Sequence, residues 1–281
     1  MLVHPDIDPV AFALPAFTVF GHTVHLQVHW YGLMYLLGFY GFWWLGTRRA
    51  RYPHVNWPHE RVGDLLFYAV LGVILGGRLG YTLFYAYTPD GRWLEALDPT
   101  YVFKVWDGGM SFHGGLIGVI VAMIVFARQR GLPFWEVADF AAVITPFGLF
   151  TGRIGNFING ELWGKVTSLP WGMVFQEAHD GLPHHPSQLY EAALEGLGLL
   201  TLLWWFGRSP RPRMAISGLF LLGYGCIRFG LEFVRLPDPQ FGYLLWGWVT
   251  MGQVLSLPMI ACGLLFLYWS YRRGAGTAGA G

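Results

Sequence analysis

The sequence predicts an all-α protein, a polytopic bundle of about seven transmembrane helices. Hydrophobic residues make up 54% of its 281 residues and charged residues only 12%, about half the charged fraction of a typical soluble domain. Its 14 Trp, 14 Tyr and 22 Phe residues favour a protein with broad membrane interfaces, where aromatic rings accumulate. This composition argues against a freely soluble enzyme, and a net charge of +1 gives no reason to expect a nucleic-acid partner.

Seven stretches approach the roughly 20 apolar residues that a helix needs to cross the hydrocarbon core of a bilayer. We expect these spans at residues 28–47, 63–87, 111–127, 136–159, 188–206, 214–234 and 249–270. No fixed-period repeat or linker divides the chain, so residues 1–281 are expected to form a single integral-membrane domain. The Gly- and Ala-rich residues 274–281 predict a disordered tail.

The basic residues predict how the spans are oriented. Eleven of the 18 Lys and Arg residues fall on one face of the predicted bundle, and the opposite face holds only Arg92, Lys104, Lys165 and Arg235. The positive-inside rule places the eleven in the cytoplasm. With an odd number of spans, the N-terminus is then outside and the C-terminus cytoplasmic, and the loops at about 88–110, 160–187 and 235–248 lie outside.

The remaining three bases, Arg78, Arg153 and Arg228, lie inside or at the edge of predicted spans. An arginine at the centre of a bilayer costs at least about 2.5–3.5 kcal/mol on insertion scales. Each therefore needs an acidic partner, a water-filled cavity or an anionic ligand. For Arg78 the pattern leaves open both a pairing with Asp64 or Asp139 and a place in a site.

Arg153 opens a polar motif, Gly152–Gly164, near the outer end of the fourth span. On a helix Arg153, Asn156 and Gly160 share one face. A guanidinium and an amide beside glycines suit a phosphate or a carboxylate, because arginine binds such groups with a planar fork. The motif favours an anion site over a packing network.

Arg228 has Glu232 at i+4 and Arg235 at i+7 on the same helical face. An intramembrane ion pair would explain the first two residues. Because two arginines flank one glutamate, one positive charge has no matching acid in this segment, and this excess favours an anionic ligand.

Two histidine-containing segments leave alternatives open. His113 lies at the outer mouth of the third span, where a general base and a structural histidine are equally compatible with the pattern. In the segment His185–Glu191, capping of a helix by Ser187 is favoured over catalysis by His185.

Several common catalytic motifs are missing from the sequence. It contains no His-Glu-x-x-His, no Gly-rich phosphate loop and no Gly-x-Ser-x-Gly elbow, and no residues at metal-ligand spacing. Cys226 and Cys262 lie in apolar runs, and we expect both to be small buried hydrophobes.

The motif Gly152–Gly164 resembles the signature of the bacterial prolipoprotein diacylglyceryl transferase family. Similar blocks lie at His29–Tyr35, Gly76–Tyr81, Val105–Gly118, His185–Glu191 and Gly223–Arg235. The resemblance implies a multi-pass inner-membrane enzyme whose active site faces the periplasm. Such an enzyme moves the diacylglyceryl group of phosphatidylglycerol to the lipobox cysteine thiol in the signal peptide of a preprolipoprotein. This first step of bacterial lipoprotein maturation releases glycerol 1-phosphate and needs no metal or other cofactor.

The resemblance also assigns roles to residues. It implies catalytic roles for His113, Arg153, Arg228, Glu161 and Tyr31, and substrate binding by Arg153, Asn156, Gly164, Tyr224, Arg228 and Glu232. Without it, Tyr31 is interpreted as a residue of the interfacial aromatic belt. We expect Arg153 and Arg228 to clamp the lipid phosphate, with Asn156 and Glu161 holding the headgroup or orienting the arginines. His113 is a candidate base, although the resemblance does not identify the group that takes the thiol proton.

Two other functions compete with this interpretation. A membrane lipid or solute transporter would also place arginines in its spans, but it predicts pseudo-repeats with broken helices in matching positions. The sequence has no such symmetry. A non-catalytic membrane scaffold would leave the polar motif at Arg153–Gly164 without a purpose.

Overall fold

The computed structural model describes residues 2–15, 17–19, 22–24, 27–55, 57–85, 109–237 and 242–277, with the backbone alone at 17–19, 22–24, 84–85 and 273–277. The chain forms two compact units. Unit 1 comprises Met1–Gly46 and Asp139–Gly281, and unit 2 comprises Thr47–Ala138. Most of the predicted outer loop at 88–110 lies outside the described residues.

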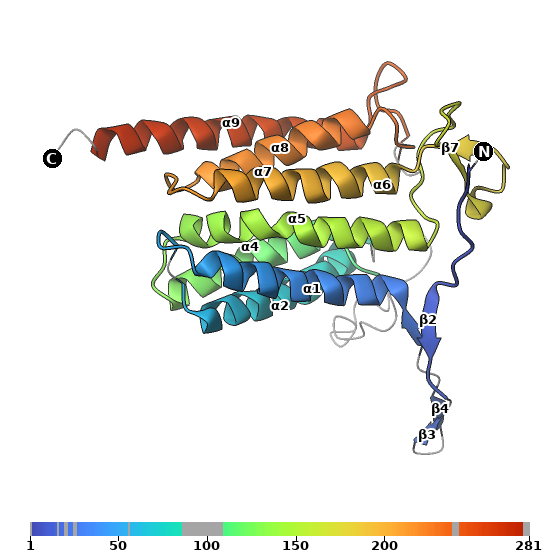
Figure 1. Ribbon diagram of the computed structural model, residues 1–281, viewed down its shortest axis with the longest axis horizontal. Coiled ribbons are helices and arrows are strands. Elements are labelled where there is room, and N and C mark those ends of the chain that lie inside the picture. The colour runs from blue at the N-terminus through green and yellow to red at the C-terminus, as the bar shows by residue number, and fades with distance from the viewer. Residues whose placement is uncertain are drawn as a thin grey trace. The chain divides into compact units, whose positions relative to one another are not determined.

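The described chain is mostly helical, as predicted (Figure 1). Its helices are α1 (Trp30–Ala50), α2 (His59–Tyr85), α4 (Phe112–Gln129), α5 (Phe134–Ile158), α6 (Ser187–Glu191), α7 (Leu199–Phe206), α8 (Ala215–Leu231) and α9 (Met251–Thr277). A π-helical segment, η4 (Ala192–Gly198), joins α6 directly to α7. Helical segments therefore lie at all seven stretches predicted to span the membrane, and α9 includes residues 274–277 of the predicted tail.

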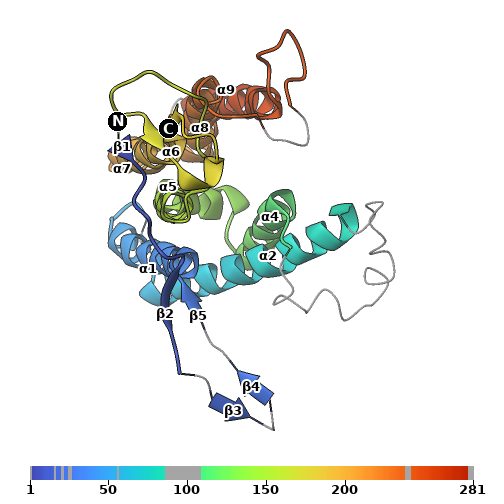
Figure 2. The same cartoon turned by 90° about the vertical axis from the view of Figure 1, so that its right-hand side faces the viewer.

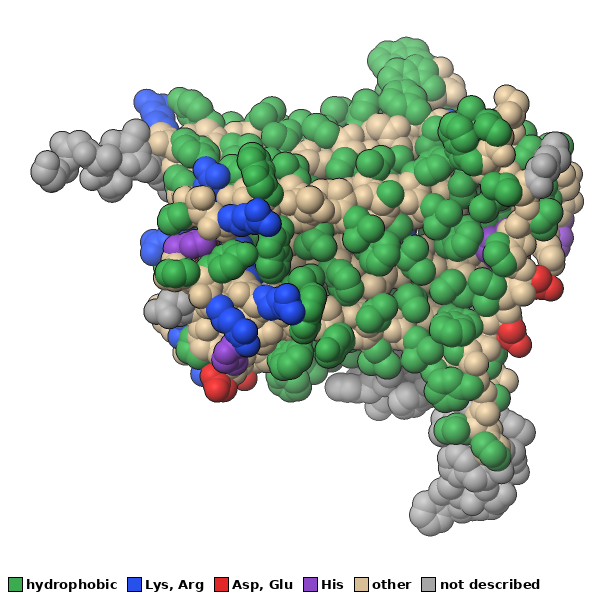
Figure 3. Space-filling view, in the orientation of Figure 1, with side chains coloured by type: hydrophobic (Ala, Val, Ile, Leu, Met, Phe, Trp, Pro, Cys, Tyr) green, Lys and Arg blue, Asp and Glu red, His purple; other side chains and the backbone are tan. Residues whose placement is uncertain are grey.

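Four of these helices, α2, α4, α5 and α9, are long and apolar enough to cross a membrane, and α8 is a shorter apolar helix. Large apolar side chains are exposed along the flanks of the helices (Figure 3). Cys226 on α8 and Cys262 on α9 are also exposed, so the prediction that both are buried is wrong. Small apolar residues on a membrane helix can face lipid as readily as protein.

The all-α prediction missed the short strands of the described chain. β1 (Leu2–Val3), β6 (Met173–Val174) and β7 (Pro183–His184) form a sheet in which β1 is parallel and β7 antiparallel to β6. β2 (Val10–Ala13) pairs with β5 (Gln27–His29), and β3 (Phe17–Val19) with β4 (His22–Val24), both antiparallel. Strands of two to four residues are too short to give a period-two hydrophobic pattern.

In unit 1, glycines let helices approach closely. A Cβ added at Gly41 of α1 would overlap the ring of Phe147 on α5, and one at Gly38 would lie 2.9 Å from the hydroxyl of Thr151. On α8, a Cβ at Gly218 would lie 3.0 Å from the carbonyl oxygen of Gly263 on α9. Figure 2 shows α8 and α9 side by side. Small residues at these positions are typical of helix packing in membranes.

In unit 2, α2 and α4 pack through facing glycines, among them Gly72, which lies against Gly118. The caps of α4 agree with its sequence. Ser111 accepts a hydrogen bond from the N–H of Gly114 at 3.2 Å, and Gly131 adopts a φ of 64° just after the helix ends.

The buried Arg78 on α2 donates a hydrogen bond to the carbonyl of Gly109 at 3.0 Å. Of the two acids proposed as its partner, Asp64 does not fit that role. Asp64 lies fourteen residues away on the same helix, or about 21 Å at 1.5 Å per residue, and pairs with Arg130. Asp139 accepts hydrogen bonds from the backbone of Met214 and Ser217, at 2.8 Å each.

Candidate active site

Three arginines and three glutamates form a buried cluster in unit 1, which we call the Arg–Glu cluster. Arg153 comes from α5, Glu191 from α6 and Glu195 from η4, while Arg228 lies on α8 and Glu232 and Arg235 follow it. The side chains of Glu191 and Glu195 are at most 1% exposed, but those of Arg153 and Arg228 are 20% and 16% exposed. The glutamates are therefore the buried side of the cluster, and these two arginines keep an accessible edge.

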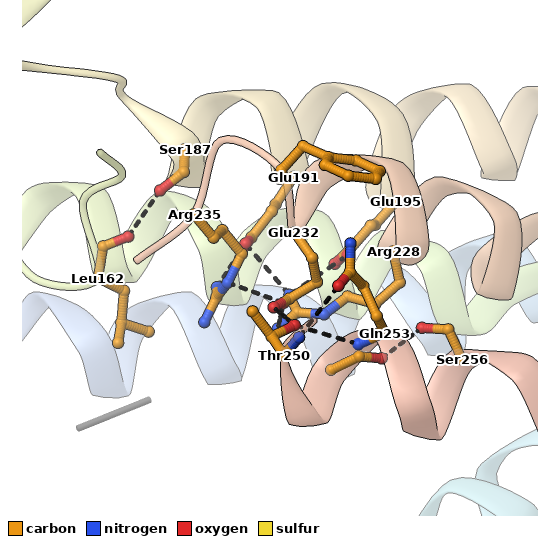
Figure 4. Close-up of polar contacts among 12 residues, drawn as sticks. Leu162, Ser187, Glu191, Glu195, Arg228, Glu232, Arg235, Thr250, Gln253 and Ser256 are labelled. Carbon is orange, nitrogen blue, oxygen red and sulfur yellow. Dashed lines mark hydrogen bonds and ion pairs between the residues drawn. The ribbon is translucent and has the colours of Figure 1, made fainter. Parts of the chain in front are cut away.

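Glu191 is the acid on which the arginines converge. Its Oε2 lies 2.8 Å from Nε of Arg153, and its Oε1 lies 3.2 Å from Arg228 and 2.5 Å from Arg235. Figure 4 shows Arg228 and Arg235 beside Glu191, with dashed lines marking their contacts. One carboxylate thus brings Arg153 and Arg228, the two predicted clamp residues, together.

The other two glutamates complete the ion pairing. Glu195 lies 3.5 Å from Arg153 and 3.6 Å from Arg228. Glu232 lies 2.7 Å from Arg228, which confirms that pair, and 3.2 Å from Arg235. Because three glutamates face three arginines, the cluster is formally neutral, and the predicted excess of positive charge around Arg228 is wrong.

Glu232 also joins the cluster to the start of α9. Its carboxylate accepts a hydrogen bond from the hydroxyl of Thr250 at 2.6 Å, and the amide oxygen of Gln253 accepts one from the backbone of Thr250 at 3.0 Å (Figure 4). Tyr224 of α8 lies beside the charges of Glu195 and Arg228. The structure therefore brings Tyr224, Arg228 and Glu232 together, and their role in substrate binding stays a prediction.

The interpretation of the sequence missed Glu191 and Glu195 as members of a site. Glu191 was assigned to the first turn of a capped helix, and Glu195 was not singled out. A signal was present, because both acids lie in the predicted span 188–206, where a carboxylate needs a partner as much as an arginine does. Their i,i+4 spacing also places them on one helical face.

A second polar group lies at the C-terminal end of α5. Glu161 accepts hydrogen bonds from the side-chain amides of Asn156 and Asn159, at 2.9 and 3.4 Å. Tyr31 of α1 packs its ring against Gly155 and lies beside Asn156 and Glu161. The structure thus joins Tyr31, Asn156 and Glu161. The predicted roles of Tyr31 and Glu161 rest on the family resemblance, and that of Asn156 also on its helical face.

Gly164 lies where two backbone segments meet. Its N–H donates to the carbonyl of His185 at 2.8 Å, and an added Cβ would overlap the carbonyl oxygen of Val234. Only a residue without a side chain fits this close approach. Gly164 therefore contacts both segments through its backbone.

The interpretation of the segment His185–Glu191 needs one correction. Ser187 is the first residue of α6 and makes no capping hydrogen bond; its hydroxyl donates instead to the carbonyl of Leu162, at 2.8 Å. His185 lies 3.3 Å from the hydroxyl of Tyr190. Burial, and then the nearby charges of His184 and Lys165, lower the pKa of His185, which favours its neutral form.

His113 is the second residue of α4 and belongs to unit 2, where its side chain is exposed and its ring packs edge-on against Phe112. Its assignment as a base stays a prediction. Among the described residues, no group of three or more His, Cys, Asp or Glu side chains could hold a metal ion.

An anion would reach the Arg–Glu cluster at the partly exposed side chains of Arg153 and Arg228. The buried glutamates contact Nε and one terminal nitrogen of Arg153 and both terminal nitrogens of Arg228, while both side chains stay partly exposed. Charge-assisted hydrogen bonds to a phosphate or carboxylate are strong where water is excluded.

Comparisons with known proteins show the family of the chain. The family model for prolipoprotein diacylglyceryl transferase matches residues 18–269. A Methylococcus capsulatus protein is 56% identical over 97% of this chain and 99% of its own length, and an Azotobacter vinelandii protein is 54% identical over 99% and 100%. Both are named phosphatidylglycerol–prolipoprotein diacylglyceryl transferase. Because the match covers nearly the whole of each protein, the chain belongs to the prolipoprotein diacylglyceryl transferase family.

Proposed function

We propose that this chain transfers the diacylglyceryl group of phosphatidylglycerol to the lipobox cysteine thiol of preprolipoproteins and releases glycerol 1-phosphate. Relatives that match over nearly their full length are named for this transfer. The observation that carries the proposal is the convergence of Arg153 and Arg228 on the buried carboxylate of Glu191. In a chain of this family, that convergence supplies a place for the lipid phosphate.

The reaction forms a C–S bond and breaks the C–O bond between the diacylglycerol carbon and the phosphate. The nucleophile is the thiolate, so the thiol must first lose its proton. The phosphate is singly charged as a diester and leaves as a doubly charged monoester. The proton lost by the thiol passes through the base to the monoester or to water. Guanidinium groups fixed at the leaving phosphate stabilise that developing charge in the transition state.

The residues around the arginines are proposed to hold the rest of the lipid headgroup. Asn156 and Glu161 are hydrogen-bonded to one another, which supports a shared role in holding the glycerol headgroup, and Tyr31 borders them. Tyr224 and Glu232 border the arginines. Gly164 leaves room for the backbone contacts beside Arg235.

The same proposal includes the membrane arrangement. We infer seven crossings in the bacterial inner membrane, with the N-terminus and the cluster on the periplasmic side and the C-terminus in the cytoplasm. The support comes from seven helical segments at the predicted positions and from the distribution of basic residues.

A transfer assay tests the function. Purified protein in phosphatidylglycerol vesicles should add one diacylglyceryl group, seen by mass spectrometry, to a lipobox peptide and release one glycerol phosphate per peptide. A peptide with serine in place of the cysteine serves as the control. Lipid movement without a covalent product would favour a transporter, and neither activity from folded protein would contradict the proposal.

The same assay tests Arg153. Arg153 reaches Glu191 through Nε and Glu195 through a terminal nitrogen. We expect Arg153→Lys to lower kcat/KM at least about tenfold, because lysine has no planar fork. Arg211→Lys is the matched control, since Arg211 lies on the exposed loop before α8. Full activity of Arg153→Lys would contradict the clamp.

The pH dependence of the rate tests His113 as the base. If its imidazole accepts the thiol proton, His113→Gln should lower kcat and remove the limb of the pH profile that the imidazole causes. A rate near that of the wild type with an unchanged profile would remove His113 from this role.

A further inference from the structure

Two segments of unit 1 are joined by four hydrogen bonds. The Glu161–Gly164 turn follows α5, and the His184–Gln188 segment leads into α6. Gln188 donates to the carbonyl of Glu161 at 2.5 Å, and Ser187 to that of Leu162 at 2.8 Å. The ring of His184 bonds the carbonyl of Gly164 at 2.7 Å, and Gly164 donates to the carbonyl of His185 at 2.8 Å.

The turn holds a backbone conformation that its sequence does not favour. Leu162 has a φ of 61°, in the left-handed region where the Cβ of an L-residue crowds the following carbonyl. Burial of the leucine does not explain this conformation, because Leu162 is 46% exposed. Such strain persists where surrounding contacts fix the backbone. The contacts here are those that hold the carbonyls of Glu161 and Leu162.

The residues that make these contacts are fully buried. Ser187 and Gln188 are both 0% exposed, so water does not compete for their hydrogen bonds with the turn. The hydroxyl of Ser187 is directed at the carbonyl of Leu162 across the gap between the two segments (Figure 4).

The conformation of the turn sets the positions of site residues at both of its ends. Glu161 begins the turn and presents its carboxylate to Asn156 and Asn159. Gly164 ends the turn and pairs with Arg235, whose guanidinium contacts Glu191. A change of φ at Leu162 would move both ends relative to one another.

We propose that Ser187 and Gln188 are positioning residues for the transfer reaction: they hold Leu162 in its left-handed conformation and thereby orient Glu161 and Gly164. The inference rests on the proposed function, and it adds residues that touch none of the charged groups of the cluster through their side chains. It assigns to the start of α6 a role other than helix capping.

Rescue by a second substitution tests this inference. Ser187→Ala should lower kcat/KM about tenfold, because it removes the hydroxyl that donates to the carbonyl of Leu162. Leu162→Gly in the same chain should restore most of the loss, since glycine adopts a positive φ without support from Ser187. His179→Gly is the matched control, because His179 also has a positive φ, 55°, but accepts nothing from Ser187.

Thermal unfolding gives a second readout that does not depend on activity. Ser187→Ala should lower the Tm by about 2–4 °C, and Leu162→Gly should again offset the loss. An unchanged rate and Tm in Ser187→Ala, or equal rescue by His179→Gly, would overturn the inference. If the wild-type protein transfers no lipid, the proposed function fails, and the unfolding experiment still decides whether Ser187 holds the turn.

Discussion

The carboxylate of Glu191 lies within 3.2 Å of three guanidinium groups that come from different parts of the chain. A buried charge is tolerated only with partners, and removing one partner of a buried pair typically costs about 3–5 kcal/mol. Glu191 therefore has two effects. It compensates the arginines, and it fixes the distance between Arg153 and Arg228.

The first prediction at this scale is a large loss of stability in Glu191→Ala. We expect the free energy of unfolding to fall by about 3–5 kcal/mol, because three arginines lose a shared partner. Asp64→Ala is the matched control. Its partner Arg130 is 46% exposed, and exposed ion pairs contribute at most about 1 kcal/mol. Equal losses in the two variants, measured by unfolding in one detergent, would show that Glu191 is not the centre of the cluster.

At the scale of the helices, glycines decide which elements can pack. A Cβ at Gly118 of α4 would overlap the carbonyl oxygen of Gly72 on α2, whereas one at Gly63 of α2 would meet no atom within 4 Å. The two helices are thus held at a distance that only glycine permits at Gly118.

We expect Gly118→Ala to destabilise unit 2 by about 1–3 kcal/mol, the usual effect of overpacking. Gly63→Ala is the control on the partner helix, and it should be neutral or stabilising by up to about 1 kcal/mol. The Tm of each variant in detergent measures the difference. A Gly118→Ala variant as stable as the wild type would mean that α2 and α4 are not packed through this contact.

The helical segments were predictable because long apolar runs leave few alternatives. The pair Arg228–Glu232 was predictable for a similar reason, since i,i+4 neighbours meet on any helix. Glu191 and Ser187 were assigned to a helix start because their partners, Arg153 and Leu162, lie far away in the sequence. Spacing within one element cannot show such contacts. The left-handed Leu162 gave no sequence signal, because leucine does not favour that conformation.

At the scale of the whole molecule, the two cysteines of the chain, Cys226 and Cys262, report on the bilayer. Both are exposed on apolar helices, so in a membrane they should face lipid. We expect a charged, impermeant maleimide to label neither cysteine in intact vesicles, and to label both once the protein is unfolded in detergent, because the reactive thiolate does not form in hydrocarbon. A variant lacking both cysteines controls for reaction elsewhere. Fast labelling by the impermeant reagent would contradict the placement of α8 and α9 in the membrane.

The lipid phosphate should bind at one place in the molecule, between Arg153 and Arg228. A structure of the protein with phosphatidylglycerol bound tests this most directly. We predict the phosphate oxygens within hydrogen-bonding distance, about 3 Å, of the guanidinium groups of both Arg153 and Arg228, with Glu191 still beneath them. A phosphate bound in contact with neither arginine would contradict the clamp and, with it, the proposed chemistry of the Arg–Glu cluster.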